Sequence, residues 1–252
     1  MKLYQRFSSF MCRKKKQAKE LKRLRQQANV AKDAQFPQVE WLSYHIPKTA
    51  GTSLKQAFEE AFTAESILYC YKDSFAKEMN LGLPVWCSAK VKLIHGHFLA
   101  HPAHKFIYPN AKRIVWLRPP VERAWSMVSH WMRYDNYPKV CQELLKHEPQ
   151  LAENKELLFH RLINTVALKP YFAAYSRYLD GYQPEDFAFI GNSQFFTDEL
   201  ARLSSVMGIE LKEVRLNTGC YKSDVPQYLV DEFNERYVAE VQLFTHFTAY
   251  VK

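Results

Sequence analysis

Short apolar runs alternate with amphipathic stretches throughout the chain after residue 35. Runs rich in bulky and aromatic side chains are typical of buried strands. Four runs of this kind are Val39–Ile46, Val91–Ile94, Arg113–Leu117 and Phe187–Ile190, and the apolar run Ile67–Tyr71 also suits a buried strand.

The segments between these runs repeat apolar residues at helical spacing. After Thr52 the apolar positions form one stripe of an amphipathic helix: Leu54, Ala57, Phe58, Ala61 and Phe62. Further helices are predicted after Pro119-Pro120, within residues 139–180, over Phe195–Met207, and as one amphipathic helix over Tyr228–Phe247. Strands that alternate with helices predict an α/β fold, with a parallel sheet covered by helices on both faces.

The net charge of +9 is concentrated at the N-terminus. Residues 1–35 hold eleven lysines and arginines against Glu20 and Asp33, so residues 36–252 carry no net charge. We therefore divide the chain into a basic helical tail, 1–35, and one domain, 36–252, whose neutrality argues against nucleic-acid binding. The tail helix, 13–31, fits a solvated or partner-packed helix, or one resting on anionic lipid or another acidic partner.

Two further patterns bear on location. No apolar run approaches the ~20 residues of a membrane span, and basic residues at 13–16 interrupt any signal-peptide core. The five cysteines are odd in number and lack C-x-x-C spacing, which argues against a disulfide framework and favours a reducing compartment. The expectation is a cytoplasmic protein, with the tail as a possible peripheral membrane contact.

The run 47–53 (PKTAGTS) joins the first predicted strand to the first predicted helix. Unpaired backbone N–H groups and the positive end of the helix dipole suit such a junction to a phosphate. Lys48 adds a charge, and Gly51 allows close approach to the backbone. The run is not a Walker A loop, because its lysine precedes the glycine. The alternative is an ordinary turn capped by Thr52 or Ser53.

The run 117–126 (LRPPVERAWS) forms a second strand–helix junction. Arg118 lies at the carboxyl end of a strand, where ligands bind in open α/β sheets, and its planar fork can bond two phosphate oxygens. Ser126 falls about two turns into the next helix, near enough to share one anion with Arg118. The alternatives are a surface ion pair for Arg118 and a small packing residue for Ser126.

Together, the runs 45–53 (HIPKTAGTS) and 117–126 resemble two motifs of PAPS-dependent carbohydrate sulfotransferases in sequence, order and separation. These are the 5′-phosphosulfate loop and the 3′-phosphate motif. The resemblance is closest to the hexuronyl 2-O-sulfotransferases of heparan and dermatan sulfate and to bacterial members of the superfamily. It implies a P-loop-like three-layer fold and transfer of a sulfuryl group from 3′-phosphoadenosine 5′-phosphosulfate (PAPS) to a hydroxyl, with a saccharide as the expected acceptor.

The resemblance also implies residue roles. Lys48 would contact the oxygen that bridges phosphate and sulfuryl group, while Arg118 and Ser126 would hold the 3′-phosphate. The 5′-phosphate would lie against the loop formed by Thr49, Ala50, Gly51, Thr52 and Ser53. Pro119 departs from the Asp or Asn usual in the family, and proline removes a backbone donor and fixes φ.

The triplet His95-Gly96-His97 lies between the two motifs. The 2-O-sulfotransferases have a similar triplet there, whose second histidine is the catalytic base. The resemblance thus implies His97 as the base and His95 in support, and the scheme requires no metal. A histidine suits removal of a hydroxyl proton near neutral pH. Two alternatives remain: a zinc site of His97, His101 and His104, or structural histidines.

Two further groups of residues are weaker candidates for the site. Thr218, Gly219 and Lys222 lie where the family closes a basic loop over the 3′-phosphate, although a plain surface loop fits them equally. Trp131, Arg133 and Tyr134 could line a sugar site or belong to the core.

The rival functions are a kinase-like enzyme that binds nucleotide phosphates and a non-catalytic module acting through the basic tail. The sequence sets neither the acceptor nor the oligomeric state.

Overall fold

A parallel sheet forms the centre of the structure, a computed structural model that describes residues 33–71, 74–213 and 224–250. The strands of the described residues are β1 (Trp41–Tyr44), β2 (Ile67–Cys70), β3 (Leu93–Gly96), β4 (Lys112–Leu117) and β5 (Phe189–Asn192). They pair in the order β2-β3-β1-β4-β5, all in parallel. The predicted α/β class is confirmed, and the run at Ile67–Tyr71 is a strand.

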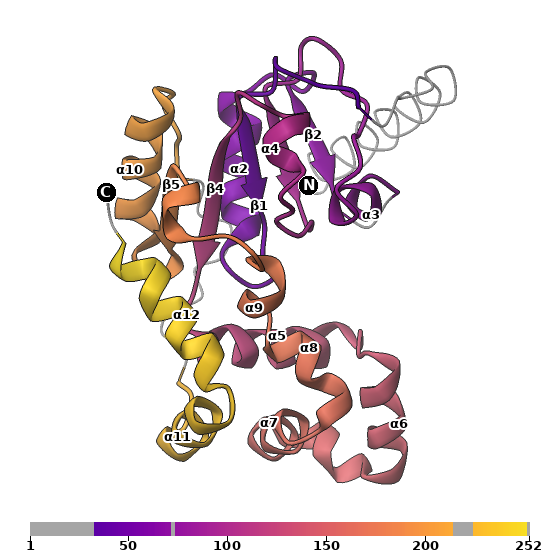
Figure 1. Cartoon of the computed structure of the whole chain (residues 1–252). Helices are drawn as coiled ribbons and strands as arrows, with labels where there is room; N and C mark the ends of the chain where they lie inside the picture. Colours follow the sequence, from indigo (N-terminus) through magenta and orange to yellow (C-terminus); the bar gives the residue numbers. More distant parts are fainter. Residues whose placement is uncertain (1–32, 72–73, 214–223, 251–252) are drawn as a thin grey trace, which may run out of the picture.

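Helices follow the strands along the chain (Figure 1). They are α2 (Gly51–Ala61), α3 (Ser74–Asn80), α4 (His104–Ile107), α5 (Pro120–Tyr134), α6 (Lys139–His147), α7 (Lys155–Ile163), α8 (Lys169–Phe172), α9 (Tyr175–Tyr178), α10 (Phe196–Met207), α11 (Gln227–Arg236) and α12 (Val238–Ala249). Short 3-10 turns lie at Pro149–Glu153, Val166–Leu168, Pro184–Asp186 and Ser193–Phe195. The predicted tail helix, 13–31, lies outside the described residues.

The prediction of one helix over Tyr228–Phe247 is wrong, because the chain leaves helical geometry at Tyr237 (φ −113°, ψ 39°). At that break the Tyr237 hydroxyl donates to the Ile163 carbonyl at 3.0 Å, and its ring stacks on Phe233 with centroids 4.6 Å apart. The break sends α12 in a new direction, from the helical part of the molecule back toward the sheet (Figure 1).

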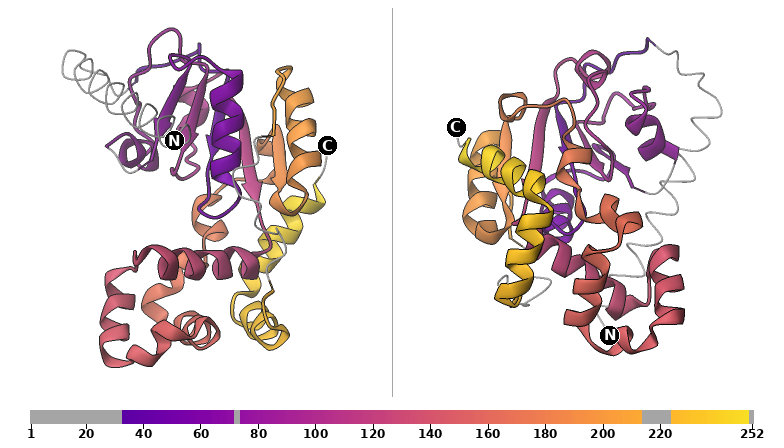
Figure 2. Two further views of the ribbon diagram at one scale, coloured as in Figure 1. Left: turned by 180° about the vertical axis from the view of Figure 1, so that it is seen from behind. Right: turned by 60° about the horizontal axis from the view of Figure 1, so that its bottom comes forward.

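Helices cover both faces of the sheet, as Figure 2 shows from two further directions. Successive residues of a strand point to opposite faces. In β1, Trp41 therefore packs with α2 and α10, while Leu42 and Tyr44 pack into a core shared with α3, α4, α9 and α12. A third apolar cluster joins α5, α6, α7, α8 and α11 beyond the carboxyl edge of the sheet. Helix α5 thus begins at that edge and is anchored in the helical group.

The glycine of the His95-Gly96-His97 triplet has a packing reason. A Cβ on Gly96 would lie 1.7 Å from the backbone oxygen of Cys70 on the neighbouring strand β2. The oxygen belongs to the backbone of Cys70, which pairs with Gly96 at the end of the β2–β3 ladder, so it cannot move away without disturbing that ladder. Gly96 therefore allows the close approach of β2 and β3 that places the two histidines.

We predict that Gly96→Ala lowers the free energy of unfolding by about 3 kcal/mol or more, because overpacking against backbone cannot relax through a rotamer change. Gly181→Ala is the control. Gly181 has φ +73° but nothing within 4 Å of an added Cβ, so its loss should be about 1 kcal/mol. Urea unfolding of both variants measures the difference, and equal losses would contradict the packing reason.

Candidate functional site

The order of the strands brings three loops to one place. Strand β1 lies between β3 and β4, and its last residue, Tyr44, pairs with Gly96 on one side and Val115 on the other. All three strands are parallel, so the chain leaves them at the same edge of the sheet. Lys48 follows β1, His97 follows β3 and Arg118 follows β4. The sequence-predicted phosphate and base residues therefore share one edge.

The loop between β1 and α2 has a strained backbone and an uncapped helix. Lys48 and Ala50 adopt left-handed φ angles of 74° and 64°, a conformation that costs roughly 1–2 kcal/mol for a residue other than glycine. Ala50 is the N-cap of α2, which receives no side-chain cap and has no acidic residue in its first turn. The alternative of a turn capped by Thr52 or Ser53 is therefore wrong.

Thr49 and Gly51 shape this loop from within. Thr49 is fully buried, and its hydroxyl donates to the Ile46 carbonyl at 2.8 Å, which closes the turn. A Cβ on Gly51 would lie 1.6 Å from Nε2 of His45. The His45 imidazole thus occupies the space beside the first turn of α2, and only glycine leaves room for it there.

His45 is part of a group of three histidines at the carboxyl edge. Its ring stacks on His95 (centroids 5.3 Å, interplanar angle 8°) and lies 4.4 Å from the ring of His97. Its Nδ1 is 3.2 Å from the Tyr71 hydroxyl, and Nδ1 of His95 is 2.9 Å from the Ser43 hydroxyl. His95 is fully buried, whereas His97 is half-buried. Of the predicted pair, only His97 keeps some exposed surface, and its Nε2 is buried.

Burial holds the pKa of His45 well below its ordinary value, and the neighbouring His97 and His95 lower it further. Each of these contributions disfavours the charged imidazolium. His45 is therefore a neutral imidazole near neutral pH, and it packs between Gly51 in the loop from β1 to α2 and the predicted base, His97.

His104 is a core residue. It is fully buried, its Nε2 is 3.0 Å from the Met79 carbonyl, and its Nδ1 is 3.1 Å from the Tyr44 hydroxyl. A carbonyl only accepts, so Nε2 carries the proton and Nδ1 accepts from Tyr44. Burial lowers the pKa of His104 to about 4. With both nitrogens occupied, His104 does not fit the zinc alternative, and the described residues contain no group of three potential ligands suited to a metal.

Arg118 and Ser126 lie on the second junction. Nε of Arg118 is 3.3 Å from Oε2 of Glu122, and both side chains are only 16% exposed. Gln194, which follows β5, donates to Oε1 of Glu122 at 2.8 Å. Glu122 and Ser126 are four residues apart in α5 and so share one face of that helix, while Arg118 lies in the turn before the helix and reaches Glu122 from there. Arg118 does form an ion pair, as one alternative held, but in a sheltered place at the sheet edge.

Four cations act on one another around this junction. Burial lowers the pKa of Lys48, and the charges of Arg118 and Arg133 lower it further. Burial also lowers the pKa of Lys155 to about 8, again with Arg118 and Arg133 as the neighbouring charges. Lys155, at the start of α7, has its Nζ 3.6 Å from the ring centroid of Trp125. The arrangement concentrates positive charge where a multivalent anion would be stabilised.

The remaining sequence candidates divide into two groups. Trp131 is buried against Tyr171 and Phe172 and is a core residue, while Arg133 and Tyr134 are exposed. Thr218, Gly219 and Lys222 lie outside the described residues.

Sequence reasoning missed five residues of the site: His45, Tyr71, Glu122, Lys155 and Tyr175, the last of which bonds the Arg118 backbone through its hydroxyl. His45 and Glu122 stand inside the two runs, so their position was a usable signal. Tyr71 ends the predicted strand run Ile67–Tyr71, so its position was a signal as well. Nothing local marks Lys155 and Tyr175, which reach the edge only through the fold.

Comparison with known proteins adds the following. No family model matches the chain, and no curated protein matches it. Among solved structures, it is similar to a sulfotransferase from Alicyclobacillus acidocaldarius, at 15% identity and a TM-score of 0.42, over 82% of this chain and 94% of the other. It is also similar to the mouse sulfotransferase SULT7A1 complexed with PAP, at 12% identity and a TM-score of 0.43, over 87% and 88% of the two chains.

We predict that Arg133→Ala raises the pKa of Lys155 above about 8 but leaves it below its ordinary value of 10.5, because burial is the larger cause. Lys155 binds its proton more tightly in the unfolded chain than in the folded one, so it makes the free energy of unfolding rise with pH between about 8 and 10.5. In Arg133→Ala this rise should begin at a higher pH and cover a narrower range. A side-chain NMR titration measures the shift. Arg177→Ala is the control. An unchanged Lys155 pKa in Arg133→Ala would disprove the effect of the Arg133 charge on Lys155.

Proposed function

We propose that this chain is a sulfotransferase that moves a sulfuryl group from PAPS to a hydroxyl of an acceptor, which we take to be a saccharide. The observation that carries the proposal is the convergence of Lys48, His97 and Arg118 at the ends of three neighbouring parallel strands. The sequence runs that resemble the two phosphate motifs of carbohydrate sulfotransferases supply two of these three loops, those that carry Lys48 and Arg118.

The donor fits the chemistry of these residues. PAPS carries a phosphosulfate at its 5′ end and a phosphate at its 3′ position. The uncapped first turn of α2, free of acidic side chains, suits the 5′-phosphate, with Thr52 and Ser53 as hydroxyl donors. Thr49 would contribute through its backbone, because its hydroxyl already bonds Ile46. Arg118 and Ser126 suit the 3′-phosphate, and the mutual repulsion around Lys48 would fall when an anion binds.

In the proposed reaction, the acceptor oxygen displaces the donor phosphate at sulfur. His97 takes the proton of the acceptor hydroxyl as the new S–O bond forms. Lys48 and the N-terminal amides of α2 stabilise the negative charge left on the phosphate oxygen when the old S–O bond breaks. His95 supports the base through the stacked imidazole of His45. Positioning and electrostatics supply most of the acceleration, as in phosphoryl transfer.

Location and further partners belong to the same proposal. A cytoplasmic enzyme whose basic tail, 1–35, contacts a membrane surface or an acidic partner would fit the charge distribution. Within the described residues, no helix is both long and apolar enough to cross a membrane.

We predict that adenosine 3′,5′-bisphosphate binds this chain much more tightly than 5′-AMP does, because only the first nucleotide engages Arg118 and Ser126. A charged bidentate contact contributes ~1.5–3 kcal/mol, so Arg118→Ala should weaken binding of the bisphosphate by roughly ten- to a hundred-fold. Binding of 5′-AMP should change little. Calorimetry with both nucleotides measures this, and equal affinities in the wild-type protein would overturn the donor assignment.

The same titration separates the kinase-like alternative. A kinase binds ATP with magnesium through acidic metal ligands, so tight binding of ATP–magnesium with weak binding of the bisphosphate would favour it.

We predict that His97→Ala lowers kcat by about 10²–10⁴-fold and leaves bisphosphate affinity nearly unchanged, because a general base acts on the acceptor. Lys48→Ala should lower kcat and also weaken nucleotide binding, since its charge faces the donor. The rate should rise with pH as His97 loses its proton, and this limb should vanish in His97→Ala. Sulfate transfer to a panel of saccharides provides the assay, and near-normal turnover of His97→Ala would move the base elsewhere.

A further inference from the structure

The turn between β4 and α5 has few hydrogen bonds of its own. Pro119 and Pro120 have no backbone N–H, and Pro119 caps α5 without a side-chain hydrogen bond. The ladder with β5 ends at Leu117, which pairs with Asn192. Arg118, the residue that follows, is therefore left between a finished ladder and a turn of two prolines.

A single hydroxyl from another element holds the Arg118 backbone. Tyr175 accepts a hydrogen bond from the Arg118 N–H at 3.0 Å and donates one to the Arg118 carbonyl. Tyr175 is fully buried at the start of α9, and burial raises the pKa of its hydroxyl to about 12. The hydroxyl therefore keeps its proton in neutral solution and satisfies both polar groups of Arg118.

Two buried charges fix Tyr175 in turn. Glu240 of α12 is 2% exposed and accepts from the backbone N–H of Tyr175 at 2.7 Å and of Ser176 at 2.9 Å. Arg123 of α5 is fully buried, donates to the carbonyls of Tyr171 and Phe172 at 2.9 and 2.7 Å, and lies 5.7 Å from the Tyr175 ring centroid. The charge of Glu240 offsets part of the cost of burying Arg123.

We propose that Tyr175 is a positioning residue that fixes Arg118 for recognition of the 3′-phosphate, and that Glu240 and Arg123 hold Tyr175 in place for this task. The inference rests on the proposed function, because it assigns Tyr175 to the nucleotide site of that reaction. From α9, the Tyr175 hydroxyl supplies the hydrogen bonds to the Arg118 backbone that a turn containing Pro119 and Pro120 cannot make. Arg118 thus starts from a fixed backbone, and its guanidinium loses less freedom when an anion binds.

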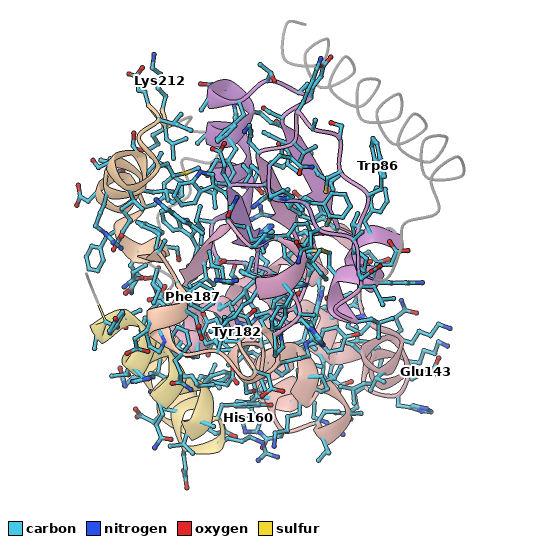
Figure 3. The ribbon with its side chains drawn as sticks, turned by 45° about the horizontal axis from the view of Figure 1, so that its top comes forward. Trp86, Glu143, His160, Tyr182, Phe187 and Lys212 are labelled. Atoms are coloured by element: carbon cyan, nitrogen blue, oxygen red, sulfur yellow. The ribbon has the colours of Figure 1, made fainter. Side chains whose placement is uncertain are left out.

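The test is Tyr175→Phe, which removes only the hydroxyl. Affinity for adenosine 3′,5′-bisphosphate should fall roughly 3- to 10-fold, the size expected for buried hydrogen bonds, while affinity for 5′-AMP should not change. Tyr182→Phe is the matched control: this buried tyrosine, beside Phe187 in Figure 3, donates to the His101 carbonyl at 2.7 Å. Both variants should lose thermal stability, but only Tyr175→Phe should lose discrimination between the nucleotides.

A double-mutant cycle with Arg118→Ala shows whether Tyr175 acts through Arg118. In the Arg118→Ala background, Tyr175→Phe should cause no further loss of bisphosphate affinity, whereas independent effects would add. Additive losses, or unchanged discrimination in Tyr175→Phe, would overturn the positioning role alone. A wild-type protein that does not distinguish the two nucleotides would overturn the proposed function, and this inference with it.

Glu240→Gln provides a second variant in case Tyr175→Phe folds poorly. The carboxamide keeps one acceptor oxygen but removes the charge and one of the two bonds to α9. Bisphosphate affinity should fall in the same direction and by less than in Tyr175→Phe, again without a change for 5′-AMP. Equal losses for the two nucleotides would contradict the assigned role.

Discussion

Parallel pairing of β1 between β3 and β4 is the constraint on which the rest of the site depends. Since these strands run in one direction, each delivers its following loop to the same edge, and the order of the sheet decides which loops become neighbours. Had β1 occupied an outer position, Lys48 could not lie between His97 and Arg118. The close approach of β2 and β3 at Gly96 places His95 and His97 beside His45 in the same site.

The edge carries electrostatic and conformational costs that do not serve folding. Lys48 and Ala50 adopt left-handed backbone angles, and the pKa values of Lys48 and Lys155 are lowered by burial together with the charges of Arg118 and Arg133. Strain and like-charge repulsion of this kind persist only where the surrounding structure enforces them, and they cluster at ligand sites. A bound anion would relieve the repulsion, which is the physical link between this geometry and the proposed nucleotide.

Local sequence predicted the parts of the site that are local in the chain. Hydrophobic periodicity and prolines predicted the five strands, the helix from Thr52 and the position of Arg118 after a strand. The structure confirms these elements, with strand ends that differ by up to about two residues and a helix that begins one residue earlier, at Gly51. What sequence could not predict depends on contacts between distant segments. Tyr175 meets Arg118 only because α9 packs against the sheet, and Lys155 nears Trp125 only because α7 packs on α5. The break at Tyr237 was missed for the same reason, since its hydroxyl finds Ile163 in another helix.

The most direct test of the central claim is a crystal structure of the chain with adenosine 3′,5′-bisphosphate. The account predicts the 5′-phosphate against the backbone N–H groups at residues 50–53 and the 3′-phosphate between Arg118 and Ser126, with His97 on the open side of the 5′-phosphate. A nucleotide bound elsewhere, or a 3′-phosphate pointing into solvent away from Arg118, would contradict it.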